Sequence, residues 1–432
     1  MIKVLRQPVY GLFMLTSLEI LFLTYAQNMF GYILSPLVLL FVSLSIAILP
    51  LFFFNQLDIQ KQTLTIQRSD RFTLLAVCLF LLIIFVMMFV PRGGLLKLYQ
   101  VFPVDKQYSD IIPTIQVMCK RLLSGQNIYV SIEEFGYHLP TTYLPMMWIP
   151  YSIAEFIVFD YRWITFLIFV FTILLTILLF VHHNRNNVLP VFLYLFFFFS
   201  LLENKSDVLG WTVEIMNGAY YTLFVIAILS GNKYFKAIAL SVCLMSRYSL
   251  VLYLPVYFIA EWQNKGFRTS FDIGAIAVTI TAAFLLILVQ NNWTELFQGF
   301  NYYSTSGLGE WRHLDDKGLP IHICNGNGFA AWVYFLKNGS LEEKFLLTRK
   351  LHFLIMIVVS FMLLLLYFFL RQRIPFVILM ICIFKIYLTF FYGFIQVPYT
   401  YLFVVPVMVS IIQVFIVNSF YVQVVPANNT RK

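Results

Sequence analysis

The sequence predicts an all-α, polytopic membrane protein, and three observations support this prediction. Of the 432 residues, 61% are hydrophobic and only 11% are charged, whereas about a quarter of the residues in a soluble domain are charged. The mean hydropathy is +0.83. Apolar windows of about 20 residues, the length that a helix needs to cross a ~30 Å hydrocarbon core, recur along the whole chain. We therefore expect one transmembrane domain over residues 1–432, with about 11–13 membrane helices, including short or re-entrant ones.

The apolar windows follow one another along the chain at 8–26, 30–54, 72–90, 143–159, 163–182, 188–202, 216–230, 237–260, 272–290, 351–370, 374–392 and 399–419. The first window is expected to be a retained helix, because no Ala-x-Ala-like cleavage site follows it. Window 143–159 is short and contains Pro145 and Pro150, so we expect it to dip into the membrane interface without crossing. Window 237–260 is interrupted by Ser246-Arg247-Tyr248-Ser249, which predicts a helical hairpin with this cluster at its tip.

Lysine and arginine in short connecting segments predict the orientation of the helices, since such residues collect on the cytoplasmic side. On this rule, both termini and segments 55–71, 182–185, 233–236, 265–268 and 371–373 are cytoplasmic. Segments 91–142 and 291–350 then become two long loops on the outer side. The net charge of +9 is spread over these short segments and forms no basic patch, so nucleic acid is not expected as a partner.

The predicted outer loops carry most of the polar chemistry. Residues 102–150 form the only long polar interruption in the first half of the chain and include an amphipathic helix, 112–124, with Gly125 as its C-terminal cap. Segment 291–350 adds the polar run 310–318 and a glycine-rich run, ICNGNGFAAW. The five cysteines show no paired C-x-x-C spacing, so the sequence predicts no metal or disulfide framework, and a divalent metal ion is left open as a cofactor.

Several short motifs occur in an order that is typical of one enzyme family. Asp110 precedes Leu122-Leu123-Ser124-Gly125-Gln126-Asn127-Ile128-Tyr129, and Tyr143-Leu144-Pro145 follows. Asn217-Gly218-Ala219-Tyr220 and Ser246-Arg247-Tyr248 come later in the chain. With these motifs the chain resembles the GT-C superfamily of membrane glycosyltransferases, and most closely the alpha-mannosyltransferase-type glycosyltransferase family 87. It departs from the family pattern in lacking the double proline after Tyr143.

The resemblance implies a division of the chain and an activity. Residues 72–290 would form the GT-C-like catalytic core, after two additional helices and a cytoplasmic loop in 1–71 and before the outer loop 291–350 and three C-terminal helices in 351–432. The implied reaction transfers a hexose or pentose, with mannose among the options, from a polyprenyl-phosphate carrier to a lipid- or glycan-linked acceptor, with inversion. The expected location is the outer face of a bacterial plasma (inner) membrane, in contact with membrane lipids.

The resemblance also implies roles for individual residues. Asp110 would be the general base, with Asp105 as its substitute. The alternative for Asp110 is that its side chain caps the 112–124 helix. The residues that would bind the donor phosphate are Arg247, Lys205, Arg312 and His313. Those that would bind the sugar or the acceptor are Tyr129, Tyr143, Tyr220, Trp311 and Tyr399.

Plainer interpretations apply to several charged residues. Arg247 and Lys385 sit in apolar windows, where a long basic side chain can snorkel to the membrane surface. Arg312 and His313 lie beside two aspartates, a pattern typical of a solvated turn. Glu19 is expected to be a helix-packing partner.

Two other classes of protein compete with a glycosyltransferase. A polymerase or ligase of surface polysaccharide would also combine about a dozen helices with large outer loops. A transporter or lipid flippase would show internal repeats and ionisable residues near the middle of several membrane helices, and the sequence contains no clear repeat.

Overall fold

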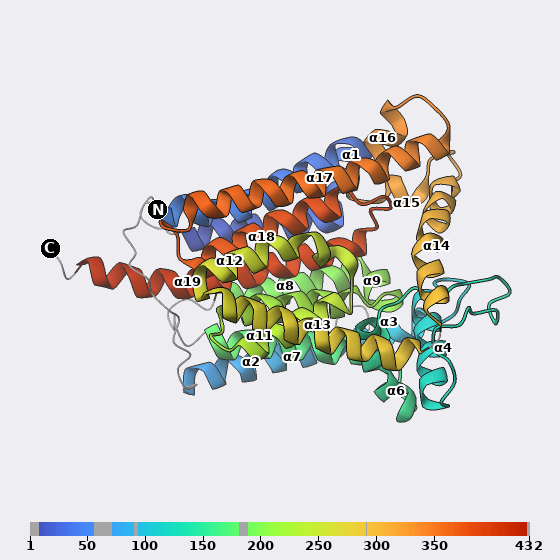
Figure 1. Ribbon diagram of the computed structural model, residues 1–432, viewed down its shortest axis with the longest axis horizontal. Helices are drawn as coiled ribbons and strands as arrows, with labels where there is room; N and C mark the ends of the chain where they lie inside the picture. Colours follow the sequence, from blue (N-terminus) through green and yellow to red (C-terminus); the bar gives the residue numbers. More distant parts are fainter. Residues whose placement is uncertain (1–7, 56–70, 90–93, 181–188, 291, 430–432) are drawn as a thin grey trace.

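The computed structural model describes residues 8–55, 71–89, 94–180, 189–290 and 292–429. Within these ranges the chain contains no strands, and its only bridges are the isolated pairs Ile132–Leu139 and Leu314–Pro320. The helices form one elongated bundle with smaller helices gathered at one end (Figure 1). Most of the expected cytoplasmic segments 55–71 and 182–185, and both chain ends, lie outside the described residues.

Six described helices are long and apolar enough to cross a membrane, which is what a helical membrane protein requires. They are Pro8–Asn55, Arg162–Phe180, Phe267–Val289, Leu341–Leu370, Phe376–Gly393 and Thr400–Phe420. Their burial differs greatly. Most of the apolar stretch of Phe376–Gly393 and Thr400–Phe420 is buried inside the protein, whereas Phe267–Val289 and Leu341–Leu370 bury only 22% of theirs. The exposed apolar faces fit a lipid surrounding, because a soluble protein rarely leaves such large patches in water.

The first helix, α1 (Pro8–Asn55), consists of two antiparallel arms that correspond to the first two predicted windows. The chain reverses at Gly31, whose φ of 67° lies in the left-handed region that glycine adopts without strain. Ser43 in the second arm donates a hydrogen bond to Glu19 in the first, and Gly11 lies against Leu49, so the arms pack along their length. Gly31 therefore sets the position of this hairpin.

The bundle is completed by α2 (Arg71–Phe89), α7 (Arg162–Phe180), α8 (Leu189–Asn204), α10 (Glu214–Leu229), α13 (Phe267–Val289), α17 (Leu341–Leu370), α18 (Phe376–Gly393) and α19 (Val404–Asn429). The starts of these helices agree with the predicted windows to within about ten residues, the largest difference being α17. Helices α10, α18 and α19 form the centre, and α18 and α19 also pack against α1.

Window 237–260 forms two short helices, α11 (Lys233–Leu244) and α12 (Leu254–Lys265), separated by residues 245–247 and the 3₁₀ turn η4 (Tyr248–Tyr253). Lys236 near the start of α11 forms an ion pair with Glu261 near the end of α12, so the two helices run in opposite directions. Lys233 pairs with Asp272 of α13 at 2.6 Å. The predicted hairpin is thus present, and Arg247 lies at its tip.

The remaining helices, all short except α14, lie at the bundle end opposite to the ends of α1 (Figure 1). They are α3 (Gly94–Val101), α4 (Ile111–Leu123), α5 (Pro145–Trp148), η2 (Ile149–Tyr151), α6 (Ser152–Phe156), α9 (Ser206–Trp211), α14 (Trp293–Arg312), α15 (Ile321–Cys324), α16 (Ala330–Leu336) and η5 (Thr400–Phe403). Helix α4 matches the predicted amphipathic helix, and Gly125 follows it with a φ of 68°. The three short pieces over 145–156 are too short to cross a membrane, as expected for window 143–159.

Segment 291–350 differs from its prediction as a long loop, because most of it is helical. Helix α14 crosses the end of the bundle (Figure 1), and the first ten residues of α17 also belong to this segment. The residues Ser-Thr-Ser-Gly within α14 are poor helix formers. Packing against α17 compensates, since Gly307 lets the backbone of α14 come close to the Phe345 ring.

Candidate functional site

Asp110 occupies the N-cap position of α4, but its side chain does not cap the helix. Its φ and ψ of −84° and −6° are helical, and no side-chain hydrogen bond to the first turn is formed. Instead, Oδ2 accepts a long hydrogen bond of 3.4 Å from the Tyr137 hydroxyl. The capping interpretation of Asp110 is therefore not supported, and the half-buried carboxylate remains available for chemistry.

The second part of the site is built by a tight turn between α14 and α15. Glu310 lies in the last turn of α14 and His313 follows three residues later, so both project from the same side of the helix. The chain then reverses through residues 315–319, where Asp315 Oδ1 accepts hydrogen bonds from the backbone amides of Lys317 and Leu319. The backbone N–H of Ile321 donates to the carbonyl of His313 at 3.0 Å.

This reversal brings His322 back onto the end of α14. His322 Nε2 lies 3.0 Å from Glu310 Oε2, and the rings of His313 and His322 are 5.3 Å apart. Each of Glu310, His313 and His322 offers one ligand atom, and these atoms all lie within 4.8 Å of one another. Within the described part of the chain, no other three His, Cys, Asp or Glu residues are grouped in this way.

A tyrosine cluster joins this group to Asp110. The Tyr399 ring packs edge-on against His322 at 5.2 Å and stacks on Tyr401 at 5.0 Å. Tyr399 and Tyr401 both interact electrostatically with Glu310 and with Asp110. The site therefore combines α4, α14, α15 and the chain just before α19, segments that are far apart in the sequence.

The electrostatics of the two carboxylates differ. Burial raises the pKa of Asp110 above its usual value; a backbone hydrogen bond and the Tyr137 hydroxyl oppose this rise, and the nearby Glu310 carboxylate adds to it. Burial would also raise the pKa of Glu310, but the hydrogen bond and charge of His322, with the Tyr399 hydroxyl and His313, hold that pKa below its usual value. Because its pKa is raised, the Asp110 carboxylate is the better proton acceptor of the two, whereas the Glu310 carboxylate keeps its negative charge to lower pH.

Arg247 is the third charged part of this region. Its guanidinium forms an ion pair with Glu214, a carboxylate only 2% exposed, and Glu214 also accepts a 2.9 Å hydrogen bond from Asn217. Arg247 Nε is buried without a hydrogen-bond partner. The guanidinium interacts electrostatically with Tyr401, which connects it to the tyrosine cluster. The Arg247 side chain is therefore held by Glu214 and does not snorkel to the membrane surface, and its Nε–H remains free to donate a hydrogen bond.

Three predicted sugar-binding residues are buried as structural side chains. Trp311 is 0% exposed and its Nε1–H donates to the carbonyl of Gln396 at 2.9 Å. Tyr129 is 0% exposed and donates to the carbonyl of Tyr143 at 3.1 Å, and Tyr220 donates to the carbonyl of Met146 at 3.2 Å. Trp311 and Tyr129 have no accessible surface and Tyr220 is only 6% exposed, so their rings cannot stack on a sugar and these residues are removed from the candidate site.

The other predicted residues divide between the site and the surface. Tyr143 is half-buried and interacts electrostatically with Tyr399, which keeps it near the site. Asp105 is exposed, and its Oδ1 accepts a hydrogen bond from the Gln107 amide at 2.9 Å, a turn-forming role. Arg312 forms an exposed ion pair with Glu342, and Lys205 lies at the start of α9. Arg312 and His313 are both exposed, as the solvated-turn interpretation expects, although the partner of Arg312 is Glu342 and not a neighbouring aspartate.

The sequence does not single out Glu310 and His322 as site residues. The one pattern that indicates part of the site is the Glu-x-x-His spacing of residues 310 and 313, which places two ligand-type side chains on one helical face. Nothing in the sequence indicates that the chain returns nine residues later to bring in His322. The turn around Asp315 and Gly318 accomplishes this.

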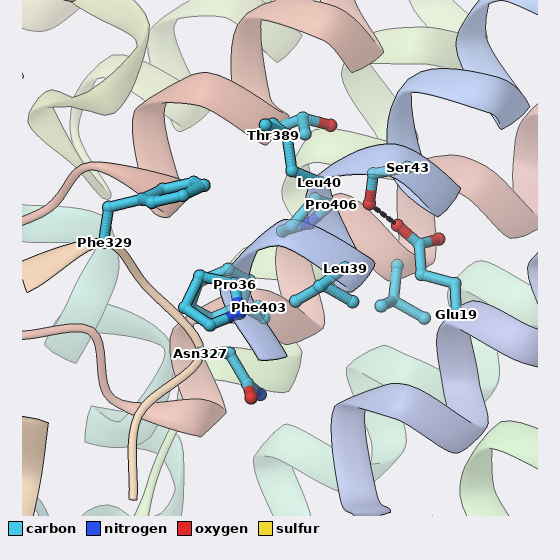
Figure 2. A pocket seen from close by; sticks show the side chains of 12 residues that line it. Glu19, Pro36, Leu39, Leu40, Ser43, Asn327, Phe329, Thr389, Phe403 and Pro406 are labelled. Carbon is cyan, nitrogen blue, oxygen red and sulfur yellow. Dashed lines mark hydrogen bonds between the residues drawn. The ribbon is translucent and has the colours of Figure 1, made fainter. Parts of the chain in front are cut away.

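Two further polar features lie inside the bundle. Lys385 pairs with Glu19 at 2.6 Å and donates to the Pro406 carbonyl at 3.0 Å, so Lys385 does not snorkel and Glu19 is the packing partner expected of it. Figure 2 shows Glu19 and Ser43 beside a cavity of about 10 Å³, which has room for about one water molecule.

The glycine-rich run packs near this cavity. An added side chain at Gly326 would clash with Pro398, so glycine is needed there for close packing of the backbone.

Comparison of the chain with protein-family models, with curated proteins and with solved structures gives no match in any of the three.

Proposed function

We propose that this protein is a membrane glycosyltransferase that takes a sugar from a polyprenyl-phosphate carrier and passes it to a lipid- or glycan-linked acceptor. The observation that carries the proposal is the position of Asp110. Its carboxylate is half-buried, does not cap α4, and belongs to an aromatic and polar cluster at one end of an apolar bundle. A lipid-linked donor would present its sugar and phosphate at this level, where the apolar helices end and polar side chains begin.

The proposed chemistry follows from these groups. The Asp110 carboxylate removes the proton of an acceptor hydroxyl as the oxygen attacks the anomeric carbon, and the bond from that carbon to the phosphate oxygen breaks. The departing polyprenyl phosphate gains negative charge, which the Arg247 guanidinium stabilises through donors arranged to match phosphate oxygens. Tyr399 and Tyr143 provide apolar ring faces for a sugar.

The test is to incubate the purified protein in nanodiscs with a panel of polyprenyl-phosphate sugars and acceptors, and to measure the release of polyprenyl phosphate. Asp110→Asn is nearly isosteric and removes only the proton acceptor, so turnover should fall by about 10²–10⁴-fold with the protein still folded. Asp105→Asn should retain turnover, because the exposed Asp105 only forms a turn. If no sugar is released from any carrier, or if Asp110→Asn keeps full turnover, the proposal is rejected.

A transporter or flippase is a second candidate, and one observation favours it. Two ion pairs, Glu19–Lys385 and Lys236–Glu261, are almost completely buried in the bundle, and ionisable residues inside a membrane often mark transport pathways. However, each charge is paired, and the cavity beside Glu19 has room for only about one water molecule. A lipid or sugar transport assay in proteoliposomes separates the two candidates, since a flippase moves its substrate without releasing polyprenyl phosphate. A polysaccharide polymerase or ligase would join glycan chains in the first assay.

A further inference from the structure

We propose that Glu310, His313 and His322 bind a divalent transition-metal ion such as Zn²⁺. Two imidazoles and one carboxylate are a common ligand set for such ions, and three protein ligands leave positions open for water or substrate, as in catalytic metal sites. The binding site itself does not depend on the proposed glycosyl transfer.

The geometry of the three side chains requires little change to bind an ion. Zinc bonds of about 2.0–2.2 Å place tetrahedral ligand atoms about 3.4 Å apart. Glu310 Oε2 and His322 Nε2 are already 3.0 Å apart. His313 lies within 4.8 Å of both, and its side chain is exposed and can close the remaining distance. The backbone holds the set in place, because the Ile321 amide is hydrogen-bonded to the His313 carbonyl.

The simpler alternative is an ordinary Glu310–His322 ion pair. That alternative does not account for His313, whose ring stands 5.3 Å from the His322 ring. One cation bound by all three side chains accounts for the position of His313 as well, because the ligand atoms of Glu310, His313 and His322 all lie within 4.8 Å of one another. The chain offers a direct comparison: His138 Nδ1 lies 2.6 Å from Glu133 and has no third ligand of this kind near it.

The location of the site indicates what the ion would do. Glu310 interacts electrostatically with Asp110, and Tyr399 interacts with both carboxylates, so the ion would act electrostatically on the proposed general base. A cation there would attract an anionic group entering the site. If the proposed function holds, the phosphate of the sugar donor is that group, and the open metal positions would stabilise its charge as it leaves.

Metal binding can be measured on the full-length protein without any donor. The protein is purified through a tag that lacks histidine, stripped with a chelator in nanodiscs, and titrated with Zn²⁺ against a chromophoric chelator, and the bound metal is counted by mass spectrometry. The wild type should bind about one more Zn²⁺ than His313→Ala, Glu310→Gln or His322→Ala. The control His138→Ala should bind as the wild type does. Bound Co²⁺ should give the visible absorption of a low-coordinate site in the wild type and not in His313→Ala.

His313→Ala is the decisive variant, because removing an exposed side chain should leave the fold intact, which thermal unfolding without metal verifies. Equal Zn²⁺ binding by the wild type and His313→Ala overturns the three-ligand site. Loss of binding in His138→Ala as well would show surface binding only and would also overturn it. Since no sugar donor is present, a failure to bind metal leaves the proposed transfer reaction standing, and failed transfer leaves the metal site standing.

Discussion

Asp110 shows how its surroundings can prepare a single side chain for acid–base chemistry. An ordinary aspartate has a pKa of about 3.9, and burial raises the pKa of Asp110 above its usual value. A raised pKa makes the carboxylate a better proton acceptor. It also keeps the carboxyl group protonated up to a higher pH, and a general base acts only when it is deprotonated. As the pH is lowered, turnover should therefore begin to fall at a higher pH than an ordinary aspartate would give.

The Tyr137 hydroxyl provides a test of this pH dependence. Its hydrogen bond stabilises the charged carboxylate and so lowers the pKa of Asp110. Tyr137→Phe removes that bond, and the acid limb of the turnover–pH profile should move to still higher pH. Tyr108→Phe, at an exposed tyrosine that stacks on Trp211, serves as the control and should leave the limb in place. An acid limb that moves to lower pH in Tyr137→Phe would contradict the assigned role of Asp110.

Arg247 has both a structural and a proposed functional role, and a set of variants can separate them. Arg247→Ala leaves Glu214 buried without a counterion, a change that typically costs about 3–5 kcal/mol of stability. Arg247→Lys keeps a charge for Glu214 but loses the planar fork of donors, so it should keep the fold and recover only part of the turnover. The measurements are thermal unfolding, turnover and donor affinity.

The double variant Arg247→Ala/Glu214→Gln removes the uncompensated charge and should restore stability. If Arg247 stabilises the departing phosphate, turnover in the double variant should stay low, with donor affinity less affected. Recovery of both stability and turnover would instead show that Arg247 serves only to neutralise Glu214.

At the scale of helices, the ion pair Glu19–Lys385 joins the α1 hairpin to α18 in the centre of the bundle. Lys385→Met leaves Glu19 buried and unpaired, and we expect a loss of about 3–5 kcal/mol. Glu19→Gln/Lys385→Met removes both charges and should recover most of that loss, because no unpaired charge is then left buried in the bundle. Thermal unfolding in detergent measures both. Transport in proteoliposomes by the wild type, and its loss in a double variant of normal stability, would favour the flippase alternative.

The predicted helices agree with the structure where hydrophobicity alone is sufficient. A long apolar stretch has one stable state in a bilayer, so the windows that became α7, α8, α13 and α18 could be located from the sequence. Helix α14 could not, because its Gly, Ser, Thr and Asn residues favour loops, and contacts with other segments, α15 and α17 among them, stabilise it as a helix.

At the scale of the whole molecule, the polar helices gather at one end of the bundle and the ends of α1 lie at the other (Figure 1). This arrangement agrees with the side assignment from the basic residues, which remains a prediction. Membrane-impermeant maleimide applied to intact cells tests it. Gln126→Cys, in the segment after α4, should be labelled from outside, and Asn264→Cys, near the end of α12, should be labelled only after the cells are opened. The parental chain corrects for its own cysteines. The opposite pattern would place the candidate site on the cytoplasmic face.

Local sequence features suffice to predict an all-helical protein with apolar helices long enough to cross a membrane, the break between α11 and α12, and the place of Asp110 at the start of α4, because hydrophobicity, proline, glycine and charge act locally. Which polar residues meet depends on the packing of the helices. This packing buries Trp311, Tyr129 and Tyr220 beneath other side chains and brings His322 and Tyr399 to Glu310, near Asp110. These contacts join residues up to nearly 300 positions apart, and no local pattern encodes them, because they depend on how whole helices pack.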